Sequence, residues 1–311
     1  MAPSHETDGV APPSSAHGRC HPPRVKLPQR GIFLGFAWSG ADDAGHRIVA
    51  AQVECEVERA RLAKVWRPFQ EVPGRHEVLD RFSDWVTEQA RWAEGRLTIG
   101  LDVPFSLAET HLRQLGLLRQ ALRGPASLGK GLREKFQSLV TDVGSAADAF
   151  RAELGKDRPR LADCYRAVSQ PPTAARNYRR TFFGLLALAR LDAAFLPWDD
   201  PQLGKPTLVE VYPPHLPRTL AGMCSYRDDD GVARPSVRAA VLRTLRTAAR
   251  LEFEMEQAAQ IVEDGEGETL DAVLAAVAAA GAQEEGYQQV PHNVPRSEGW
   301  IYSVREEPWR G

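Results

Sequence analysis

Residues Leu97 to Ser106 read Leu-Thr-Ile-Gly-Leu-Asp-Val-Pro-Phe-Ser, and this stretch decides the expected fold. Its first residues have the apolar composition of a buried parallel strand, and Pro104 ends that strand because proline has no backbone donor for the ladder. Asp102 therefore stands at the carboxyl end of the strand, where open α/β sheets place ligands and catalytic groups. The alternative is an ordinary strand-end turn in which Asp102 bonds its own backbone.

The chain has 311 residues, of which 43% are hydrophobic and 26% are charged, and its formal net charge is −2. This composition is typical of a globular protein with a sizeable core, and the overall charge indicates no particular partner. The sequence contains no apolar run long enough for a membrane span and no signal peptide. Its cysteines form no Cys-x-x-Cys pair. We therefore expect a cytoplasmic protein without a membrane partner, of unspecified oligomeric state.

Apolar periodicity predicts the other elements of the fold. The expected strands are 31–39, 47–57, 63–69, 97–101 and 207–212, with a last short strand over 299–304. The expected helices are 75–89, 236–262 and 269–280. Three strands that form a meander, followed by strands that alternate with helices, predict an α/β fold: a mixed sheet of about five strands flanked by helices.

The chain is expected to contain one domain preceded by a leader. Residues 1–30 are rich in Pro, Ser and His, and we expect them to be disordered, whereas residues 31–311 form the domain. Residues 109–206 are too long for one crossover helix, contain helical pieces over 109–123 and 173–195, and carry more Lys and Arg than Asp and Glu. We interpret them as a helical insertion over the functional edge of the sheet. The alternative for the basic excess is a set of solvated helix faces.

Further carboxylates stand in apolar elements. Glu210 lies inside the strand over 207–212, and Asp271 lies near the start of the helix over 269–280, with Glu268 just before it. A buried carboxylate needs a cationic partner or a metal ion. Several carboxylates that meet at one sheet edge suit Mg²⁺ and two-metal phosphodiester hydrolysis. The alternatives are an ion pair between Glu210 and an arginine of the insertion, or an exposed edge strand, and ordinary helix N-terminal acids at Glu268 and Asp271.

An ordered set of motifs resembles a known family, the predicted nucleases of domain-of-unknown-function family 429 (DUF429). The resemblance runs from about Gly31 to Tyr302 and implies a ribonuclease H-like fold and a suspected metal-dependent nuclease activity. The motifs are Gly35-Phe-Ala-Trp-Ser-Gly-Ala41, Ile99-Gly-Leu-Asp-Val-Pro-Phe105, Arg179-Arg-Thr-Phe-Phe-Gly184, Val209-Glu-Val-Tyr-Pro213, Thr269-Leu-Asp-Ala-Val273 and Glu298-Gly-Trp-Ile-Tyr302.

The chain departs from the family pattern in its first strand. The resemblance implies an aspartate in a Gly-x-Asp-x-Ser-Gly context that bridges the metal ions, but Ala37 stands at this position and has no donor atom. Asp42 and Asp43 follow in the next turn. A side chain in this turn and the side chain of a strand residue five positions earlier point to different places. Glu268 stands where the family often has aspartate, which keeps the charge on a longer side chain.

These residues give a first hypothesis, a divalent-metal-dependent, nuclease-like hydrolase of phosphodiester bonds. Asp102, Glu210 and Asp271 are its candidate catalytic residues, and together with Glu268 they are its candidate ligands for Mg²⁺ or Mn²⁺. Arg176, Arg179 and Arg180 of the insertion are candidates for substrate binding, because a guanidinium fork binds phosphate bidentately.

The second hypothesis is a catalytically degenerate ribonuclease H-like protein that binds nucleic acid, a nucleotide or a protein partner. It follows from Ala37. A third, minor hypothesis gives His215 a role in general acid–base chemistry, with a loop histidine as its alternative. The sequence lacks a glycine-rich phosphate loop, a nucleophile elbow and a His-Glu-x-x-His motif, which weighs against kinases, α/β-hydrolases and zinc proteases.

Overall fold

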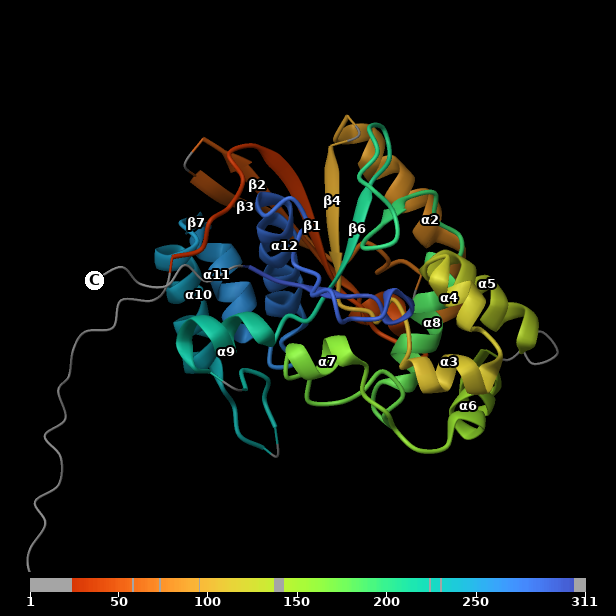
Figure 1. Cartoon of the computed structure of the whole chain (residues 1–311). Coiled ribbons are helices and arrows are strands. Elements are labelled where there is room, and N and C mark those ends of the chain that lie inside the picture. Colours follow the sequence, from red (N-terminus) through yellow and green to blue (C-terminus); the bar gives the residue numbers. More distant parts are fainter. Residues whose placement is uncertain are drawn as a thin grey trace, which may run out of the picture.

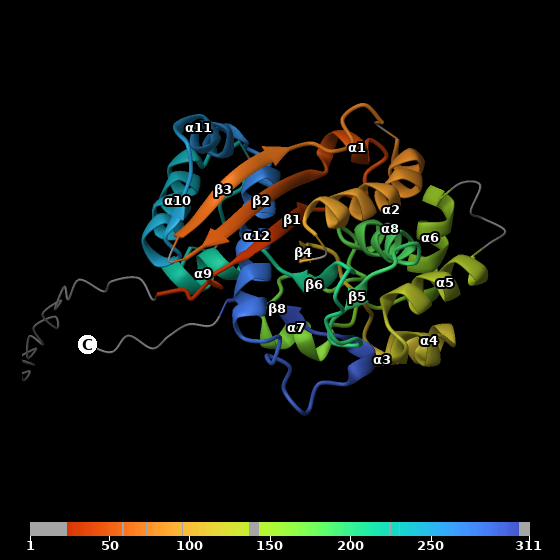
Figure 2. The same ribbon diagram turned by 90° about the horizontal axis from the view of Figure 1, so that it is seen from above.

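The structure is a computed structural model that describes residues 24–57, 59–72, 74–94, 96–136, 143–223, 225–229 and 231–304. In this part of the chain a mixed sheet lies between helices that cover both of its faces (Figures 1 and 2). The strands are β1 (Gly31–Ala37), β2 (Val49–Glu56), β3 (Arg59–Trp66), β4 (Leu97–Leu101), β5 (Ala194–Phe195), β6 (Thr207–Val211), β7 (Leu251–Glu252) and β8 (Ile301–Tyr302).

The sheet has the order β5-β6-β4-β1-β2-β3-β7, and β8 pairs with β6. Strands β1, β2 and β3 form an antiparallel meander, whereas β4 is parallel to β1 and β6 is parallel to β4. The predicted mixed α/β class is therefore confirmed. The five longer strands are the ones that the sequence predicts, although β3 begins and ends a few residues early. The last short strand expected over 299–304 is observed as β8, which has two residues. Strands β5 and β7 also have two residues each, which is too short for a periodic signal.

Helix α12 lies on one face of the sheet, and α2 and α8 lie on the other (Figure 2). The helices are α1 (Ala44–Arg47), α2 (Arg75–Trp92), α3 (Glu109–Leu115), α4 (Leu118–Leu122), α5 (Pro125–Lys135), α6 (Val143–Leu154), α7 (Leu161–Tyr165), α8 (Tyr178–Leu188), α9 (His215–Ala221), α10 (Pro235–Ala248), α11 (Met255–Glu263) and α12 (Glu268–Glu284).

The single long helix expected over 236–262 is wrong. Helix α10 ends at Ala248, Arg250 adopts a left-handed φ of 51°, and β7 pairs with β3 before α11 begins. The helical piece expected over 109–123 is likewise broken, because Gly116 adopts a φ of 73° between α3 and α4. Apolar periodicity continues across these turns, so the pattern gave no sign of either interruption.

Two glycines allow α12 to lie close against the sheet. A Cβ atom on Gly35 of β1 would come within 2.0 Å of the Ala272 carbonyl oxygen, and one on Gly100 of β4 would come within 2.4 Å of the Ala275 carbonyl oxygen. Both contacts are with helix backbone and leave no room for any side chain. This close approach carries the first turn of α12, and with it Asp271, to the carboxyl ends of β1 and β4.

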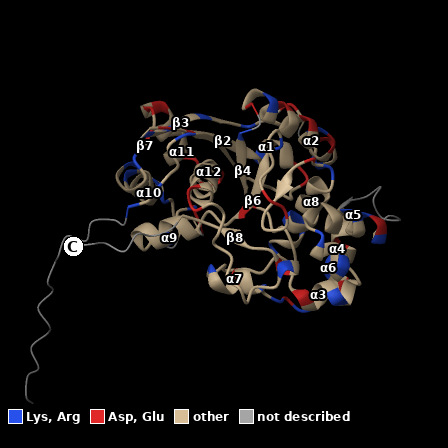
Figure 3. Cartoon of the chain, turned by 45° about the horizontal axis from the view of Figure 1, so that its top comes forward, with Lys and Arg blue, Asp and Glu red and all other residues tan. Residues whose placement is uncertain are grey.

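The insertion over 109–206 contains α3 to α8 and β5 (Figure 1). Helices α5, α6 and α8 pack in the core on the face of the sheet opposite α12, whereas Ala162 of α7 packs in the core on the α12 side. Acidic and basic residues are interspersed over α3 and α5 (Figure 3). The expected leader over 1–30 falls mostly on residues outside the described ranges, but the Val25 backbone N–H donates to Ala248 at 2.9 Å. No helix within the described ranges combines the length and apolarity that a membrane crossing requires.

Candidate functional site

A pocket of about 620 Å³ lies at the carboxyl ends of β1 and β4. We call it the arginine pocket, after the five arginines that line it: Arg176, Arg179, Arg180, Arg218 and Arg227. The first three are the predicted phosphate-binding residues. Ala37, Asp102, Glu268 and Asp271 line the same pocket. The structure thus brings together the predicted site residues with the exception of Glu210.

Strand alternation explains which residues meet. Gly35 and Gly100 pair in the β1–β4 register and both contact α12, so Ala37 and Asp102, two positions further on, are expected on the same side of the sheet. Glu210 pairs with Leu101 in the β4–β6 register. Leu101 packs in the core on the opposite face, and Glu210 faces that side as well. The period of two therefore keeps Glu210 out of the arginine pocket, although Glu210 and Asp102 both line a smaller pocket of about 20 Å³ that adjoins it.

Each of the two aspartates in the pocket is bound by an arginine. The Arg180 guanidinium donates to Asp102 at 2.7 Å, and the Asp102 side chain is 6% exposed. Asp271 is completely buried and accepts hydrogen bonds from the Tyr226 hydroxyl and from the Arg227 guanidinium. The positive charges of the arginines therefore lie directly against the carboxylates that the sequence marks as metal ligands.

Two carboxylates of the pocket, Asp271 and Glu268, hold protons more tightly than free side chains do. Burial raises the pKa of Asp271 to about 6, against the opposing effect of Arg227, and the negative charge of Asp102 adds to the rise. Burial also raises the pKa of Glu268 to about 7, opposed by Arg67, whose Nη1 lies 3.5 Å from Oε2. The influence of Asp102 on Asp271 indicates that these two charges lie near each other in the pocket.

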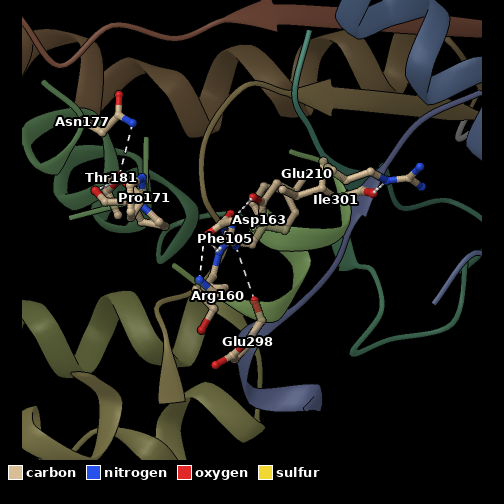
Figure 4. Close-up of polar contacts among 12 residues, drawn as sticks. Phe105, Arg160, Asp163, Pro171, Asn177, Thr181, Glu210, Glu298 and Ile301 are labelled. Atoms are coloured by element: carbon tan, nitrogen blue, oxygen red, sulfur yellow. Dashed lines mark hydrogen bonds and ion pairs between the residues drawn. The ribbon is translucent and has the colours of Figure 1, made fainter. Parts of the chain in front are cut away.

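Glu210 belongs to a separate, buried ion-pair network (Figure 4). Arg160, which precedes α7, donates from Nη1 to Glu210 Oε2 at 2.8 Å and from Nη2 to Oε1 at 2.5 Å, and it also binds Asp163. The Phe105 backbone N–H donates to the same carboxylate at 2.8 Å. All three charged side chains are at most 3% exposed. An ion pair with an arginine of the insertion, stated above as the alternative for Glu210, is the arrangement observed.

Glu298 binds two segments of the insertion beside this network. Its carboxylate accepts from the Glu109 N–H at 2.8 Å and from the Leu161 N–H at 2.6 Å, at the starts of α3 and α7. Its backbone carbonyl also accepts a hydrogen bond from Arg160 at 3.4 Å. These contacts give Glu210 and Glu298 a role in joining the insertion to the sheet.

The carboxylate arrangement does not fit a two-metal centre as it stands. Asp102 and Asp271 are bound by guanidinium groups, Glu210 is on the other face of the sheet, and Ala37 supplies no ligand. Within the described ranges, no group of three or more His, Cys, Asp or Glu side chains is placed to hold a metal ion. A cation at this pocket would need to compete with Arg180 and Arg227 for the oxygen ligands that Mg²⁺ requires.

Buried hydrogen-bond donors surround the same pocket. The indole N–H of Trp38 and the Nε–H groups of Arg179 and Arg180 are buried and find no hydrogen-bond partner among the described residues. All three residues line the pocket. Leaving a buried donor without an acceptor costs about 1–3 kcal/mol.

Some residues of the site carried no sequence signal. Arg218 lies on α9 and Arg227 lies in the following loop, outside the motifs quoted above. Arg160 was implied only as an unspecified arginine of the insertion. His215, at the start of α9, is half-buried, and burial together with Arg166 and Arg218 lowers its pKa to about 4. It is therefore neutral at pH 7, and its Nε2 lies 3.5 Å from Arg166.

The fold and the pocket together define an α/β protein with an arginine-lined site at the carboxyl ends of parallel strands. A family model described as "Protein of unknown function (DUF429)" matches residues 40–296. The chain therefore belongs to the DUF429 family. Comparison with curated proteins and with solved structures gives no match.

The raised pKa of Glu268 predicts a pH-dependent effect of its neutralisation. Its pKa is 4.5 in an unfolded chain and about 7 in the folded protein, so the charged form destabilises the fold above pH 7 and this cost disappears as the pH falls below 4.5. Glu268→Gln is expected to raise the free energy of unfolding by about 1–3 kcal/mol at pH 8 and by less at pH 5. Urea denaturation at the two pH values measures this difference. Glu263→Gln, at an exposed position, is the control, and an equal effect of Glu268→Gln at both pH values contradicts the prediction.

Proposed function

We propose that this protein binds a phosphate-bearing ligand, a nucleotide or a nucleic acid, in the arginine pocket, and that it does so without a metal ion. The observation that carries the proposal is the set of five arginines that line one pocket. Phosphate oxygens are strong acceptors, and arginine binds them through a planar fork. A volume of about 620 Å³ also lies within the usual range for small-molecule sites.

The charge of the pocket supports an anionic ligand. Its five arginines outnumber Asp102, Glu268 and Asp271, and the raised pKa values of Asp271 and Glu268 reduce the negative charge further near neutral pH. Arg176 and Arg218 form no ion pair with any described carboxylate, although Arg218 donates from Nη1 to the Ala167 carbonyl at 2.6 Å. Arg176 and the other donors of Arg218 are available to a ligand. An anion that enters this pocket therefore meets a net positive potential.

The strand order supports the ribonuclease H-like fold implied by the family resemblance. An antiparallel meander is followed by parallel strands on the far side of β1, and α12 packs across β1 and β4. Ala37 takes the place of the first-strand aspartate in this arrangement. We therefore infer a ribonuclease H-like protein that keeps the pocket at the strand ends and uses it for binding.

Thermal unfolding of the wild type in EDTA tests the proposal. Sulfate, inorganic phosphate and adenosine monophosphate are each added at increasing concentration, with uncharged adenosine as the control. We expect inorganic phosphate and adenosine monophosphate to raise Tm in a concentration-dependent way, since a ligand that binds only the folded state stabilises it. A panel that leaves Tm unchanged contradicts the proposal.

A metal-dependent, nuclease-like hydrolase remains a second candidate function. It is favoured by the position of Asp102 and Asp271, which line the same pocket. Wild-type protein and an Ala37→Asp variant are incubated with Mg²⁺ or Mn²⁺ and with single-stranded, duplex and hybrid substrates. Cleavage by the wild type that is lost in Asp102→Ala supports the hydrolase. Cleavage only by Ala37→Asp supports a binding protein that has lost its catalytic site.

A further inference from the structure

The surroundings of the arginine pocket are strongly asymmetric. Arg176, Arg179 and Arg180 approach it from the start of α8. On the side of α12 the pocket is bounded by two adjacent loops, which the hydrogen bond from the Asp228 N–H to the Gly265 carbonyl joins at 2.8 Å. Within residues 227–229 and 263–268 these loops carry one arginine and several carboxylates. We call this border the acidic rim; its carboxylates are Asp228, Asp229, Glu263, Asp264, Glu266 and Glu268.

Nearby arginines neutralise only part of the acidic rim. Arg238 binds Asp228 at 2.7 Å, and Arg67 lies 3.5 Å from Glu268. Arg47, whose field reaches Glu266 and Glu268, is bound to Asp43 at 2.9 Å. Asp229, Glu263 and Glu266 are exposed, and none of them forms an ion pair with a described residue. Negative charge therefore persists on this border.

A polynucleotide needs a continuous positive track for its backbone, which carries a negative charge at every phosphodiester. A chain that runs from the arginine pocket across the α12 side would bring its next phosphates to the acidic rim, which would repel them. A small ligand whose charge is confined to one terminal phosphate avoids this repulsion. The remaining polar lining, which includes Gln170, Asn177 and Tyr212, suits the neutral part of such a molecule.

Resting on the proposed binding function, we infer that the ligand is a small phosphomonoester of nucleotide size, and that the acidic rim excludes polynucleotides. The rim thus acts as a specificity determinant, while the arginines supply the affinity. The exposed residues Asp229 and Glu266 do not line the pocket, so their replacement should change the selection between ligands and leave small-ligand binding intact.

Calorimetric titration in EDTA tests this inference with three probes: adenosine monophosphate, a tetranucleotide without terminal phosphate, and the same tetranucleotide with a 5′-phosphate. We expect adenosine monophosphate to bind at least tenfold more tightly than either tetranucleotide. In the double variant Asp229→Asn/Glu266→Gln, we expect the tetranucleotides to gain at least threefold in affinity, while the affinity for adenosine monophosphate stays within twofold. The matched control Asp84→Asn/Glu88→Gln removes two exposed charges from α2 and should change none of these values.

The outcomes separate the two proposals. If no probe binds, the proposed binding function itself is wrong. If a tetranucleotide binds as tightly as adenosine monophosphate, the proposed function stands but the inference about ligand size is overturned. An unchanged preference in the Asp229→Asn/Glu266→Gln variant shows that the rim does not select the ligand and overturns its role.

Discussion

Replacing Arg160 with methionine is expected to lower the free energy of unfolding by about 3–5 kcal/mol, because it leaves buried carboxylates without their cation. Arg160 is 1% exposed and binds both Glu210 and Asp163. Neither carboxylate reaches solvent, so water cannot replace the guanidinium. Urea denaturation of the wild type and of Arg160→Met gives the difference directly.

Two further variants make the result specific. Arg158→Met removes an exposed arginine two residues away and is expected to change the stability by less than about 0.5 kcal/mol. Arg160→Met/Glu210→Leu removes the cation and one carboxylate together, and it should recover part of the loss, since apolar replacements of buried ion pairs are often neutral. A single variant Arg160→Met that unfolds within about 1 kcal/mol of the wild type contradicts the role given to this network.

Removing Arg176 and Arg218 together is expected to weaken the binding of adenosine monophosphate about 100-fold or more. Hydrogen bonds to charged groups are each worth about 1.5–3 kcal/mol, which corresponds to roughly tenfold or more for each arginine. Because neither arginine forms an ion pair with a described carboxylate, Arg176→Ala/Arg218→Ala leaves no buried charge unpaired. Calorimetric titration measures the loss of affinity, and thermal unfolding verifies that the variant is folded.

The matched control for this pair is Arg119→Ala/Arg243→Ala, which removes two exposed arginines outside the pocket. It has the same net charge as Arg176→Ala/Arg218→Ala and should bind adenosine monophosphate as the wild type does. An affinity of Arg176→Ala/Arg218→Ala within threefold of the wild type, in a folded protein, would show that the arginine pocket is not the binding site.

The sequence predicted the parts of the fold that local patterns determine. The strand over Leu97–Leu101 has the predicted bounds, and Asp102, Glu268 and Asp271 meet at the predicted sheet edge. The face on which Glu210 lies depends on the register between β4 and β6, which no local pattern contains. For this reason the sequence does not show that Glu210 lies outside the arginine pocket, although it lines a small adjoining pocket together with Asp102.

The arginines that bind the carboxylates were also beyond the reach of local patterns. Arg180 lies 78 residues from Asp102, and Arg227 lies 44 residues from Asp271. These pairs form because the insertion and the loop before α10 fold back over the strand ends. Because of these long-range contacts, the two aspartates are bound by guanidinium groups and are not free carboxylates as the sequence alone suggests.

The most direct test of the central claim is the dissociation constant of adenosine monophosphate for the wild type, measured by calorimetry in EDTA and again with Mg²⁺. The recovered samples are analysed for adenosine and phosphate. Metal-independent binding predicts the same dissociation constant within twofold in both conditions and an intact ligand. Binding that appears only with Mg²⁺, or conversion of the ligand, would contradict the proposal that the arginine pocket binds its ligand without a metal ion.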